Sequence, residues 1–470
     1  MPRPLRSRAA RLVAGRSSAY QSPFGGPWMS SPQMEKSATQ SDVRVTFARP
    51  ATYRDVFAGA EFRAVFLADL FSLLGDQIAA VAVAVLLYER SGSPLLAALG
   101  YATAYVPWLL GGPFLAAWAE RFPGRNVLIG CDLGRAALIG LAAVPGLPLP
   151  VLGLLVLTAA LLTPPFEAAR SALLPQILEG DRYPVAMSLR DAVHQSAQLV
   201  GFGVGGALVL VLSAPGALAL NAATFAVSAL VLRFGLISRP SASVGSTGAV
   251  GPERAGGGSL WREALAGLAV IRADRMLSTP LLLGIVGAAY AIVPEAIAPA
   301  YADSVGGDAT AVGLIMAAVA GGSVVGGLAI GRLVTPRRRI RLVRPLALAG
   351  TLPLVVAGFR PGLTVSLVLF AITGLASSYQ VAANAMFAQR LPAAVRARAF
   401  GIAITGLYGG QALAIVLAGA AAQFLAPAAV VGATGLLGAL GVLLLPRPLQ
   451  STRPAHRRQR QPRRRGLRPA

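Results

Sequence analysis

The feature that most constrains this chain is a series of apolar stretches that recurs from residue 62 to residue 445. Each is close to the length of about 20 residues that a helix needs to cross the hydrocarbon core of a bilayer. Only 13% of the residues are charged, whereas soluble globular proteins have about 25%. Strands that span a bilayer alternate apolar and polar residues, and these stretches are continuously apolar. The sequence therefore predicts an all-α integral membrane protein.

Counting the apolar stretches predicts twelve transmembrane helices in two pseudo-symmetric six-helix halves. The expected spans are residues 62–87, 94–118, 127–145, 151–174, 185–212, 217–234, 279–301, 309–333, 342–359, 362–387, 399–424 and 428–445. The expected domains are a disordered basic tail (1–60), an N-terminal half (61–237), a linker with an amphipathic helix at 261–275 (238–278), a C-terminal half (279–446) and a second disordered basic tail (447–470).

The arginines are divided unequally between the two sets of loops. Loops on one side carry many of them, whereas the opposite loops carry only Arg90 and Arg360. Because cytoplasmic loops are enriched in Lys and Arg, this asymmetry predicts a plasma-membrane protein with both termini in the cytoplasm. The formal net charge of +23 is concentrated in the two tails. We attribute their charge to anionic lipid rather than to nucleic acid.

The sequence also argues against several kinds of chemistry. Cys131 is the only cysteine, and the two histidines, His194 and His456, lie far apart. This composition predicts no disulfide, no bound metal and no cofactor. Lys36 is the only lysine, and it does not follow the glycine that a phosphate-binding Walker A loop requires. Transport by this chain would therefore use an ion gradient, no energy source at all, or a separate ATPase subunit. We expect a monomer.

A short charged loop occurs once in each half of the chain. Between the second and third expected spans, Ala116 is followed at a spacing of four by Glu120, and then by Arg121. The same spacing recurs at Gly327, Gly331 and Arg332 between the eighth and ninth spans. Such internal repeats are typical of transporters that move substrate by alternating access.

Several motifs resemble those of the major facilitator superfamily, and within it the drug-efflux branch that contains macrolide and enterobactin exporters. The motifs are Ala116, Glu120, Arg121 and Arg125 in the second loop, Leu74–Asp76, Asp132–Arg135 and Ala168–Pro175. The resemblance covers about residues 60 to 446. It implies a cavity formed by spans 1, 4, 7 and 10.

Two departures from the family pattern concern individual residues. Glu120 stands where the family usually has Asp. The antiporter motif of the fifth span keeps its glycines, Gly201, Gly205 and Gly206, but lacks the proline. We expect these glycines to allow close helix packing.

The resemblance also implies a cytoplasmic gate. In the family, the acid at the position of Glu120 bridges to the other half near the eleventh span, so we expect a latch between Glu120 and Arg398. Alternatively, Glu120, Arg121 and Arg125 are solvated loop charges. Asp132 and Arg135, placed with the same gate, are three residues apart on one helix and are expected to pair.

Three acidic residues within spans are candidates for proton coupling or substrate contact. Asp69 and Asp76 lie seven residues apart, on nearly the same face of the first span. Asp76 is the nearer to mid-membrane, where a buried carboxylate can hold a proton; alternatively it is a structural hydrogen-bonding residue. Asp69 is expected to be a simple edge charge. Glu295 follows Pro294 in the seventh span and is either a second proton site or an outer-surface cap.

Four further polar residues are candidates for lining the cavity. Glu167 and Arg170 lie three apart in the fourth span and are expected to neutralise each other near the inner gate. Gln380 and Asn384 lie four apart in the tenth span. They either line the cavity or hold helices together by hydrogen bonds.

These observations predict a secondary active transporter, not an enzyme. We expect proton-coupled export of small hydrophobic or amphipathic compounds, with a small-molecule substrate, protons and the lipid bilayer as the partners. The alternatives are an importer of a small metabolite on the same fold, a non-transporting scaffold or sensor, and a membrane enzyme. Against the enzyme, the sequence offers neither metal ligands nor a nucleophile with its base.

Overall fold

The computed structural model describes residues 51–110, 121–178, 180–239, 272, 274–391 and 396–446, with side chains at all of these except 110, 336 and 396–398. These residues belong to one compact unit, Ala51–Ala470. Every regular element among them is a helix, and nine helical segments there are long and apolar enough to cross a membrane. The all-α membrane class is thereby confirmed, while the count of twelve spans stays a prediction.

The helices of the N-terminal half follow the expected spans, with some divided into shorter pieces. They are α1 (Tyr53–Phe57), α2 (Ala60–Ser91), α3 (Pro94–Ala102), α4 (Val106–Leu110), α6 (Gly124–Ala142), α7 (Leu149–Leu161), α8 (Thr163–Ile177) and α9 (Arg182–Gly235). Helices α7 and α8 together form one candidate span of 29 residues. Helix α6 occupies the expected third span but is not among the nine candidates, because it carries three charged residues.

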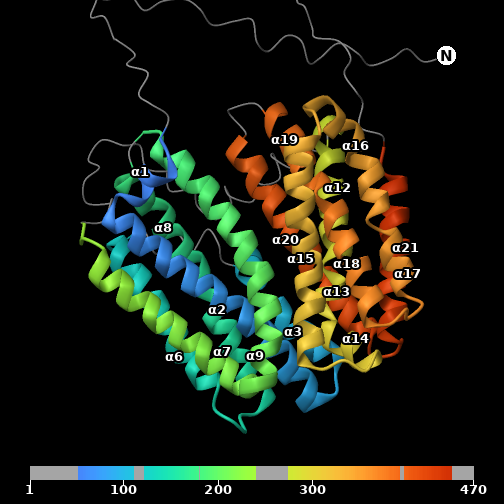
Figure 1. Cartoon of the computed structure of the whole chain (residues 1–470), viewed down its shortest axis with the longest axis horizontal. Coiled ribbons are helices and arrows are strands. Elements are labelled where there is room, and N and C mark those ends of the chain that lie inside the picture. Colours follow the sequence, from blue (N-terminus) through green and yellow to red (C-terminus); the bar gives the residue numbers. More distant parts are fainter. Residues whose placement is uncertain are drawn as a thin grey trace, which may run out of the picture. The chain divides into compact units, whose positions relative to one another are not determined.

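Helix α9 contains two of the expected spans. Its 54 residues would extend about 81 Å as one straight helix, far more than a bilayer of about 30 Å. The backbone breaks at Ser213, which has a φ of 68°, and Pro215 follows two residues later. This break falls between the expected fifth and sixth spans. In Figure 1 the green ribbon of α9 accordingly forms two arms that meet near the α9 label.

The C-terminal half begins at Arg275, four residues before the expected span. Its helices are α12 (Arg275–Ala291), α13 (Val293–Ala296), α14 (Ala298–Ser304), α15 (Ala309–Leu333), α16 (Pro336–Ala349), α17 (Leu352–Ala357), α18 (Leu363–Ser377), α19 (Tyr379–Arg390), α20 (Arg396–Ala421) and α21 (Pro427–Leu444). The expected seventh span is divided into α12, α13 and α14. Pro294 and Pro299 stand in the first turns of the two later pieces, where a missing N–H is tolerated.

The end of the predicted N-terminal tail is ordered, so for residues 53–57 the expectation of disorder is wrong. Helix α1 begins after Thr52, whose backbone N–H and hydroxyl both donate to the Asp55 carboxylate. Val56 is fully buried in a cluster with Phe62 and Leu236. The cap and the buried Val56 therefore hold this short segment against the N-terminal half. Residues 1–50, most of the linker and residues 447–470 lie outside the described residues.

Close helix contacts form where the sequence has glycine. A methyl group added at Gly201 would lie 2.6 Å from Gln77 Cβ of α2. One added at Gly206 would lie 2.6 Å from the carbonyl oxygen of Ala309 and 2.9 Å from Gly313 Cα of α15. Gly205 faces Ile78 Cα, 3.2 Å from such a methyl group. These glycines let α9 approach α2 within its own half and α15 in the other half.

The hydrophobic core joins the two halves at one end only. One cluster contains residues of both halves, among them Val85, Ile297 and Val431. At the opposite end the buried residues form separate clusters, one in the N-terminal half and two in the C-terminal half. Figure 1 shows the same arrangement, with α3 and α14 adjacent and the ends of α1 and α19 apart. We call these the joined end and the open end.

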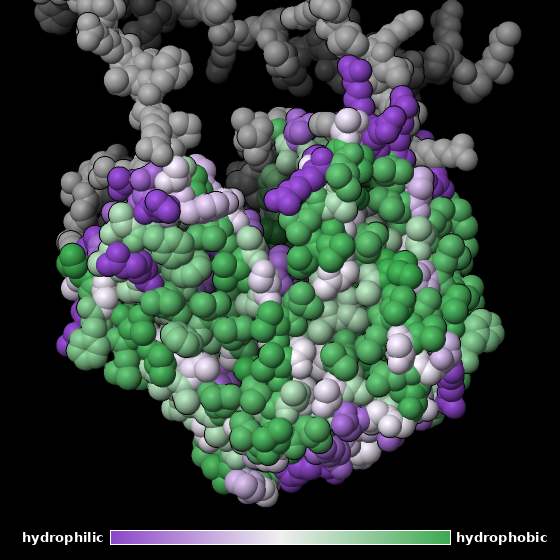
Figure 2. All heavy atoms as spheres, in the orientation of Figure 1, coloured by the Kyte–Doolittle hydropathy of each residue, from purple (hydrophilic) through white to green (hydrophobic). Residues whose placement is uncertain are grey.

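The surface of the described residues is apolar around its flank. Figure 2 shows green, apolar side chains over the middle of the molecule, with purple, hydrophilic side chains gathered at the two ends. Many large apolar side chains are exposed, including Leu154, Val211 and Leu436. Exposed apolar surface on this scale fits contact with lipid.

Candidate functional site

Four charged side chains form a network near the open end of the N-terminal half. Arg170 of α8 pairs with Asp69 of α2 and with Glu167 of its own helix. Arg190 of α9 lies 3.5 Å from Asp69 and 3.1 Å from Glu167. Arg170 is almost fully buried, with 2% of its side chain exposed. The network therefore fastens three helices together, and its two acids offset its two arginines.

This network differs from the sequence expectation at two residues. The structure pairs Glu167 with Arg170, as their spacing predicts. Asp69 is not the simple edge charge that was expected, because α8 places Arg170 against it and leaves the residue 8% exposed. Arg190 is not among the candidate residues that the sequence offers. Helix α9 begins at Arg182, which makes Arg190 a helical residue that faces the two acids.

A second buried ion pair lies on α6. Arg135 is 2.9 Å from Asp132, and both side chains are at most 4% exposed. The hydroxyl of Ser228 on α9 donates to the other oxygen of Asp132 at 2.5 Å. The guanidinium of Arg135 also lies 4.5 Å from the ring centre of Phe166 and 4.7 Å from that of Phe225. Aromatic faces and a carboxylate thus surround the cation within one half.

Three of the predicted gate residues, Arg125, Asp132 and Arg135, find their partners within the N-terminal half. Asp132 and Arg135 pair with each other inside the N-terminal half. Arg125 donates to the backbone carbonyl of Arg233 at the end of α9, and Arg121 is exposed. Glu120 and the side chain of Arg398 lie outside the described residues, so the latch between them stays a prediction.

Asp76 stands apart from the other acids of α2. It is half-buried, and none of the described residues forms a hydrogen bond or ion pair with its carboxylate. The neighbouring Gly75 packs against Asn221 and Thr224 of α9, and Gln77 packs against Gly201. Helix packing therefore holds the backbone on both sides of Asp76 while its carboxylate has no protein partner in the described part of the chain.

Glu295 on α13 is a buried acid that contacts the other half of the molecule. It is 4% exposed, and its carboxylate accepts a hydrogen bond of 2.6 Å from the Tyr101 hydroxyl of α3. Three more aromatic side chains lie near Tyr101. The ring centre of Tyr105 lies 6.0 Å from that of Tyr101 and 5.9 Å from that of Tyr408 on α20. We call Tyr101, Tyr105, Trp108 and Tyr408 the aromatic cluster.

Trp108 completes the aromatic cluster from α4. Its ring stacks on that of Tyr408, with centroids 5.5 Å apart and planes 13° from parallel. Tyr105, Trp108 and Tyr408 are each only half-buried. Helices α3 and α4 come from the N-terminal half, and α13 and α20 come from the C-terminal half, so the cluster lies between the two.

Further contacts between the halves lie on the same side as the aromatic cluster. The Tyr88 hydroxyl at the end of α2 donates to Asp303 at the end of α14, at 3.0 Å. The Gln423 amide donates to the Ser93 hydroxyl. Among the described residues, no hydrogen bond or ion pair connects the halves at the open end. The two halves are therefore in contact at the joined end and separated at the open end.

Gln380 and Asn384 lie on α19 in the C-terminal half. Gln380 is half-buried near Gly287 of α12, and Asn384 is exposed. The described residues form no hydrogen bond to either side chain. An amide without a partner between helices fits a residue that lines a cavity better than one that holds helices together. Lining of the cavity by this pair stays a prediction.

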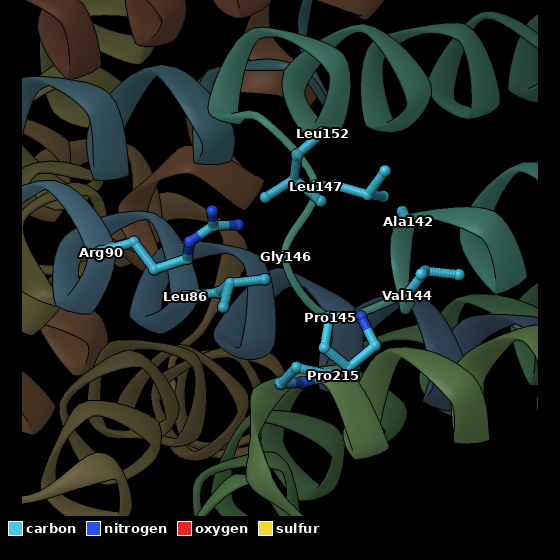
Figure 3. Close-up of a pocket in the computed structure, with 9 residues that line it drawn as sticks. All are labelled: Leu86, Arg90, Ala142, Val144, Pro145, Gly146, Leu147, Leu152 and Pro215. Carbon is cyan, nitrogen blue, oxygen red and sulfur yellow. The ribbon is translucent and has the colours of Figure 1, made fainter.

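A separate pocket of about 240 Å³ lies in the N-terminal half (Figure 3). It is formed by the end of α2, the connection between α6 and α7, and Pro215 after the break in α9. Arg90 is the one charged residue among those that line it. The volume is below the range of about 300–1,000 Å³ that ligand pockets occupy, and none of the candidate acids lines it.

Tyr101 was not among the residues expected from the sequence. The signal that could have found it is a pair of tyrosines, Tyr101 and Tyr105, one helical turn apart within a span that is otherwise apolar. A buried tyrosine hydroxyl requires a partner. The sequence does not show that this partner is Glu295, which lies 194 residues away.

Comparisons with known proteins agree on one family. The chain matches the model of the Major Facilitator Superfamily over residues 65–376 and 296–469. It is 26% identical over 399 residues to the multidrug efflux pump Tap of Mycobacterium tuberculosis, covering 79% of this chain and 91% of the pump. It is 21% identical over 350 residues to macrolide efflux protein A of Streptococcus pyogenes, covering 73% and 84%.

Solved structures share the fold. A bacterial homolog of the human lysosomal transporter Spinster, in an inward-facing and occupied conformation, aligns with a TM-score of 0.59 at 15% identity and covers 85% of this chain and 97% of that one. The nucleoside transporter NupG aligns with a TM-score of 0.59 at 12% identity and covers 81% and 97%. At these identities the likeness concerns the fold alone.

Proposed function

The chain belongs to the Major Facilitator Superfamily of transporters, and from this premise we propose that it exports small hydrophobic or amphipathic compounds in exchange for protons. Movement of the two halves between alternative conformations would carry the substrate across the membrane. The family and the fold are those of transporters rather than enzymes. Export, proton coupling and the class of substrate are the parts that we propose.

The state of Asp76 is the observation that carries the proposal. The buried acids Asp69 and Asp132 each have an arginine, whereas the half-buried Asp76 has no partner among the described residues. An ionised carboxylate in a membrane helix is costly unless it is paired. A proton is the simplest means of neutralising Asp76, and its release would supply the coupling step. Glu295 is a second candidate for this role.

The direction of transport is inferred from the efflux relatives and from the open end. The chain is similar to proteins named as efflux pumps for several drugs and for macrolides. If the arginine-rich loops are cytoplasmic, the open end faces the cytoplasm, where an exporter takes up its substrate. In that orientation the joined end closes the route to the outside.

The class of substrate is inferred from the candidate residues for the cavity. Besides the paired charges, these are Asp76, Gln380 and Asn384. Sites that select one polar metabolite position several convergent hydrogen-bonding groups around it. So few polar anchors among the candidates favour loose selection of hydrophobic compounds.

The remaining expectations complete the proposal. We place the protein in the plasma membrane as a monomer, with both termini in the cytoplasm. In the conformation opposite to this one, the open end would close. Glu120 and Arg398 would then form the latch between the halves.

Accumulation of a fluorescent efflux substrate in cells tests the function. Cells that produce the protein should hold less ethidium than cells without it, and a protonophore should abolish the difference. Asp76→Asn cannot release a proton and should also abolish it. Asp191→Asn, an exposed acid on α9, is the matched control and should export like the wild type.

Three outcomes would contradict the proposal. Greater accumulation in producing cells would indicate an importer. Equal accumulation, across several probes, would indicate a scaffold or sensor. Export by Asp76→Asn at the rate of the wild type would remove the proton-coupling role from this residue.

A further inference from the structure

The pocket in Figure 3 has a charged group near the surface and apolar side chains deeper in the helices. Arg90 lies in the last turn of α2, and Leu86 lies one turn further into the same helix. Leu152 lies one turn into α7 on the opposite side of the pocket. Leu86 and Leu152 are 8% and 1% exposed, whereas Arg90 is an exposed residue. The pocket thus has the polarity of a site for an amphiphile.

Arg90 has no partner in the described part of the chain. Neither a hydrogen bond nor an ion pair connects its guanidinium with another described residue, the adjacent Glu89 included. The other residues that line the pocket are aliphatic residues, prolines and a glycine, so no carboxylate faces the cation. In Figure 3 the Arg90 side chain extends from α2 toward the connection that carries Gly146. A guanidinium beside apolar walls can be neutralised there by an anion from outside the chain.

The connection between α6 and α7 adds a second donor. Pro145 and Gly146 lie at its centre, and Gly146 has a φ of 87°, as the third residue of a type II turn requires. The backbone N–H of Gly146 donates to no acceptor among the described residues. The lining therefore offers donors but no side-chain acceptor. It suits an anionic group without donors of its own, and it does not suit a sugar, an amino acid or an organic cation.

The pocket lies at the level where the helices of the N-terminal half end. Helix α2 ends at Ser91 and α6 at Ala142, and Pro215 follows the break in α9. Nearby in the chain, Leu141 is 51% and Val211 is 78% exposed, so the surface beside the pocket suits contact with lipid. Lipid headgroups lie where spans end, and acyl chains lie beside their apolar residues. The volume of about 240 Å³ is too small for a drug-sized compound, but part of an acyl chain fits.

We propose that this pocket binds an anionic phospholipid of the membrane. The lipid phosphate lies on Arg90, and the first part of one acyl chain lies between Leu86 and Leu152. An arginine binds two phosphate oxygens through parallel hydrogen bonds, which makes the contact strong and directional. A zwitterionic lipid binds less well, because its own ammonium group competes for the phosphate. The inference goes beyond the proposed export and does not depend on it.

Photo-crosslinking to the purified, full-length protein in phosphatidylcholine nanodiscs tests the site. The probes are phosphatidylglycerol and phosphatidylcholine with the same chains, each with a diazirine near the headgroup end of one chain and used below saturation. Mass spectrometry measures the labelling of residues 142–152, from the end of α6 into α7. We expect more labelling by phosphatidylglycerol. Arg90→Gln should lower that labelling about tenfold, which equals about 1.4 kcal/mol, and leave labelling by phosphatidylcholine unchanged.

Three further variants separate the charge from the space. Arg360→Gln changes an exposed arginine between α17 and α18 and is the matched control, with labelling as in the wild type. Val144→Trp keeps Arg90 but fills the pocket from a position that is 48% exposed, so both probes should label less. Arg90→Lys keeps the charge without the parallel hydrogen bonds, and its labelling should lie between those of Arg90→Gln and the wild type.

The outcomes distinguish a lipid site from the other roles of an arginine. Equal labelling by the two probes, or unchanged phosphatidylglycerol labelling in Arg90→Gln, would overturn the proposal. An equal loss of both probes in Arg90→Gln would also overturn it, and would mean that the cation stabilises the end of α2 through the helix dipole. Displacement of the probe by decanoate at a lower concentration than by phosphatidylglycerol would assign the pocket to a free carboxylate instead. Because nanodiscs hold no proton gradient, these results stand whether or not cells show export.

Discussion

The two halves of this transporter stabilise their buried polar groups in different ways. In the described residues, every ion pair lies between residues 61 and 239, in the N-terminal half and the start of the linker. In the C-terminal half, buried tyrosines donate to backbone carbonyls instead. Tyr290 donates to Ala347 at 3.1 Å, and Tyr379 to Leu283 at 2.8 Å. One half is held by charges and the other by neutral hydrogen bonds.

This difference has consequences for stability. Removing one member of a buried ion pair leaves an uncompensated charge and costs about 3–5 kcal/mol. Removing one neutral hydrogen bond costs about 1 kcal/mol. The N-terminal half should therefore be the more sensitive to single substitutions at polar positions. Glu295, the buried acid of the C-terminal half, accepts its hydrogen bond from Tyr101 of the other half. Substitutions at Glu295 should therefore weaken the contact between the halves.

The largest expected change in the free energy of unfolding is that of Arg170→Ala. This change leaves Asp69 and Glu167 facing each other with Arg190 as their remaining cation, and it should lower the unfolding free energy by about 3–5 kcal/mol. Thermal unfolding of the purified protein in detergent would measure the loss. Arg121→Ala, at an exposed site, should change stability by less than about 0.5 kcal/mol. If Arg170→Ala lowered the unfolding free energy by as little as Arg121→Ala, the charged network would contribute little to stability.

A double substitution in the second ion pair sharpens the comparison. Asp132→Leu alone and Arg135→Leu alone should each destabilise by about 3–5 kcal/mol, because each leaves a buried charge. The variant with both changes should be much closer to the wild type, since apolar replacements of a buried pair are often tolerated. Unfolding of all three proteins gives the coupling energy. Additive losses would mean that the two side chains act independently.

A smaller effect is expected in the C-terminal half. Tyr379→Phe removes the hydroxyl that donates to the Leu283 carbonyl but keeps the ring, which is 1% exposed. The unfolding free energy should fall by about 1 kcal/mol. Tyr53→Phe, at an exposed tyrosine, provides the control. A loss in Tyr379→Phe as large as that in Arg170→Ala would remove the contrast between the halves.

The smallest effect concerns a partly exposed ion pair that stands apart from the buried network. Arg239 donates to both oxygens of Glu61, at 2.7 and 2.6 Å. These hydrogen bonds raise the pKa of Arg239 above its usual value, so the cation persists at every working pH. With 30% of the Arg239 side chain exposed, Arg239→Gln should cost at most about 1 kcal/mol. The loss should shrink further in about 1 M salt, and a salt-independent loss would indicate a packing role instead.

Local spacing allowed part of the candidate site to be predicted. Residues three apart on a helix share a face, which is enough to pair Glu167 with Arg170 and Asp132 with Arg135. The partners that come from other helices were missed. Arg170 lies 101 residues from Asp69, and Ser228 lies 96 residues from Asp132. Nothing in the apolar pattern specifies which faces of two distant helices meet.

The sequence by itself determined the fold class and the position of most spans. Hydrocarbon offers no partner for backbone N–H and C=O groups, so a long apolar stretch in a membrane must satisfy them within one helix. Span 309–333 coincides with α15 for that reason. The tertiary structure decided which polar groups neutralise one another, that Asp76 has no partner among the described residues, and that Glu295 meets Tyr101 across the halves. Those outcomes depend on helix packing, which brings together side chains that the chain itself keeps far apart.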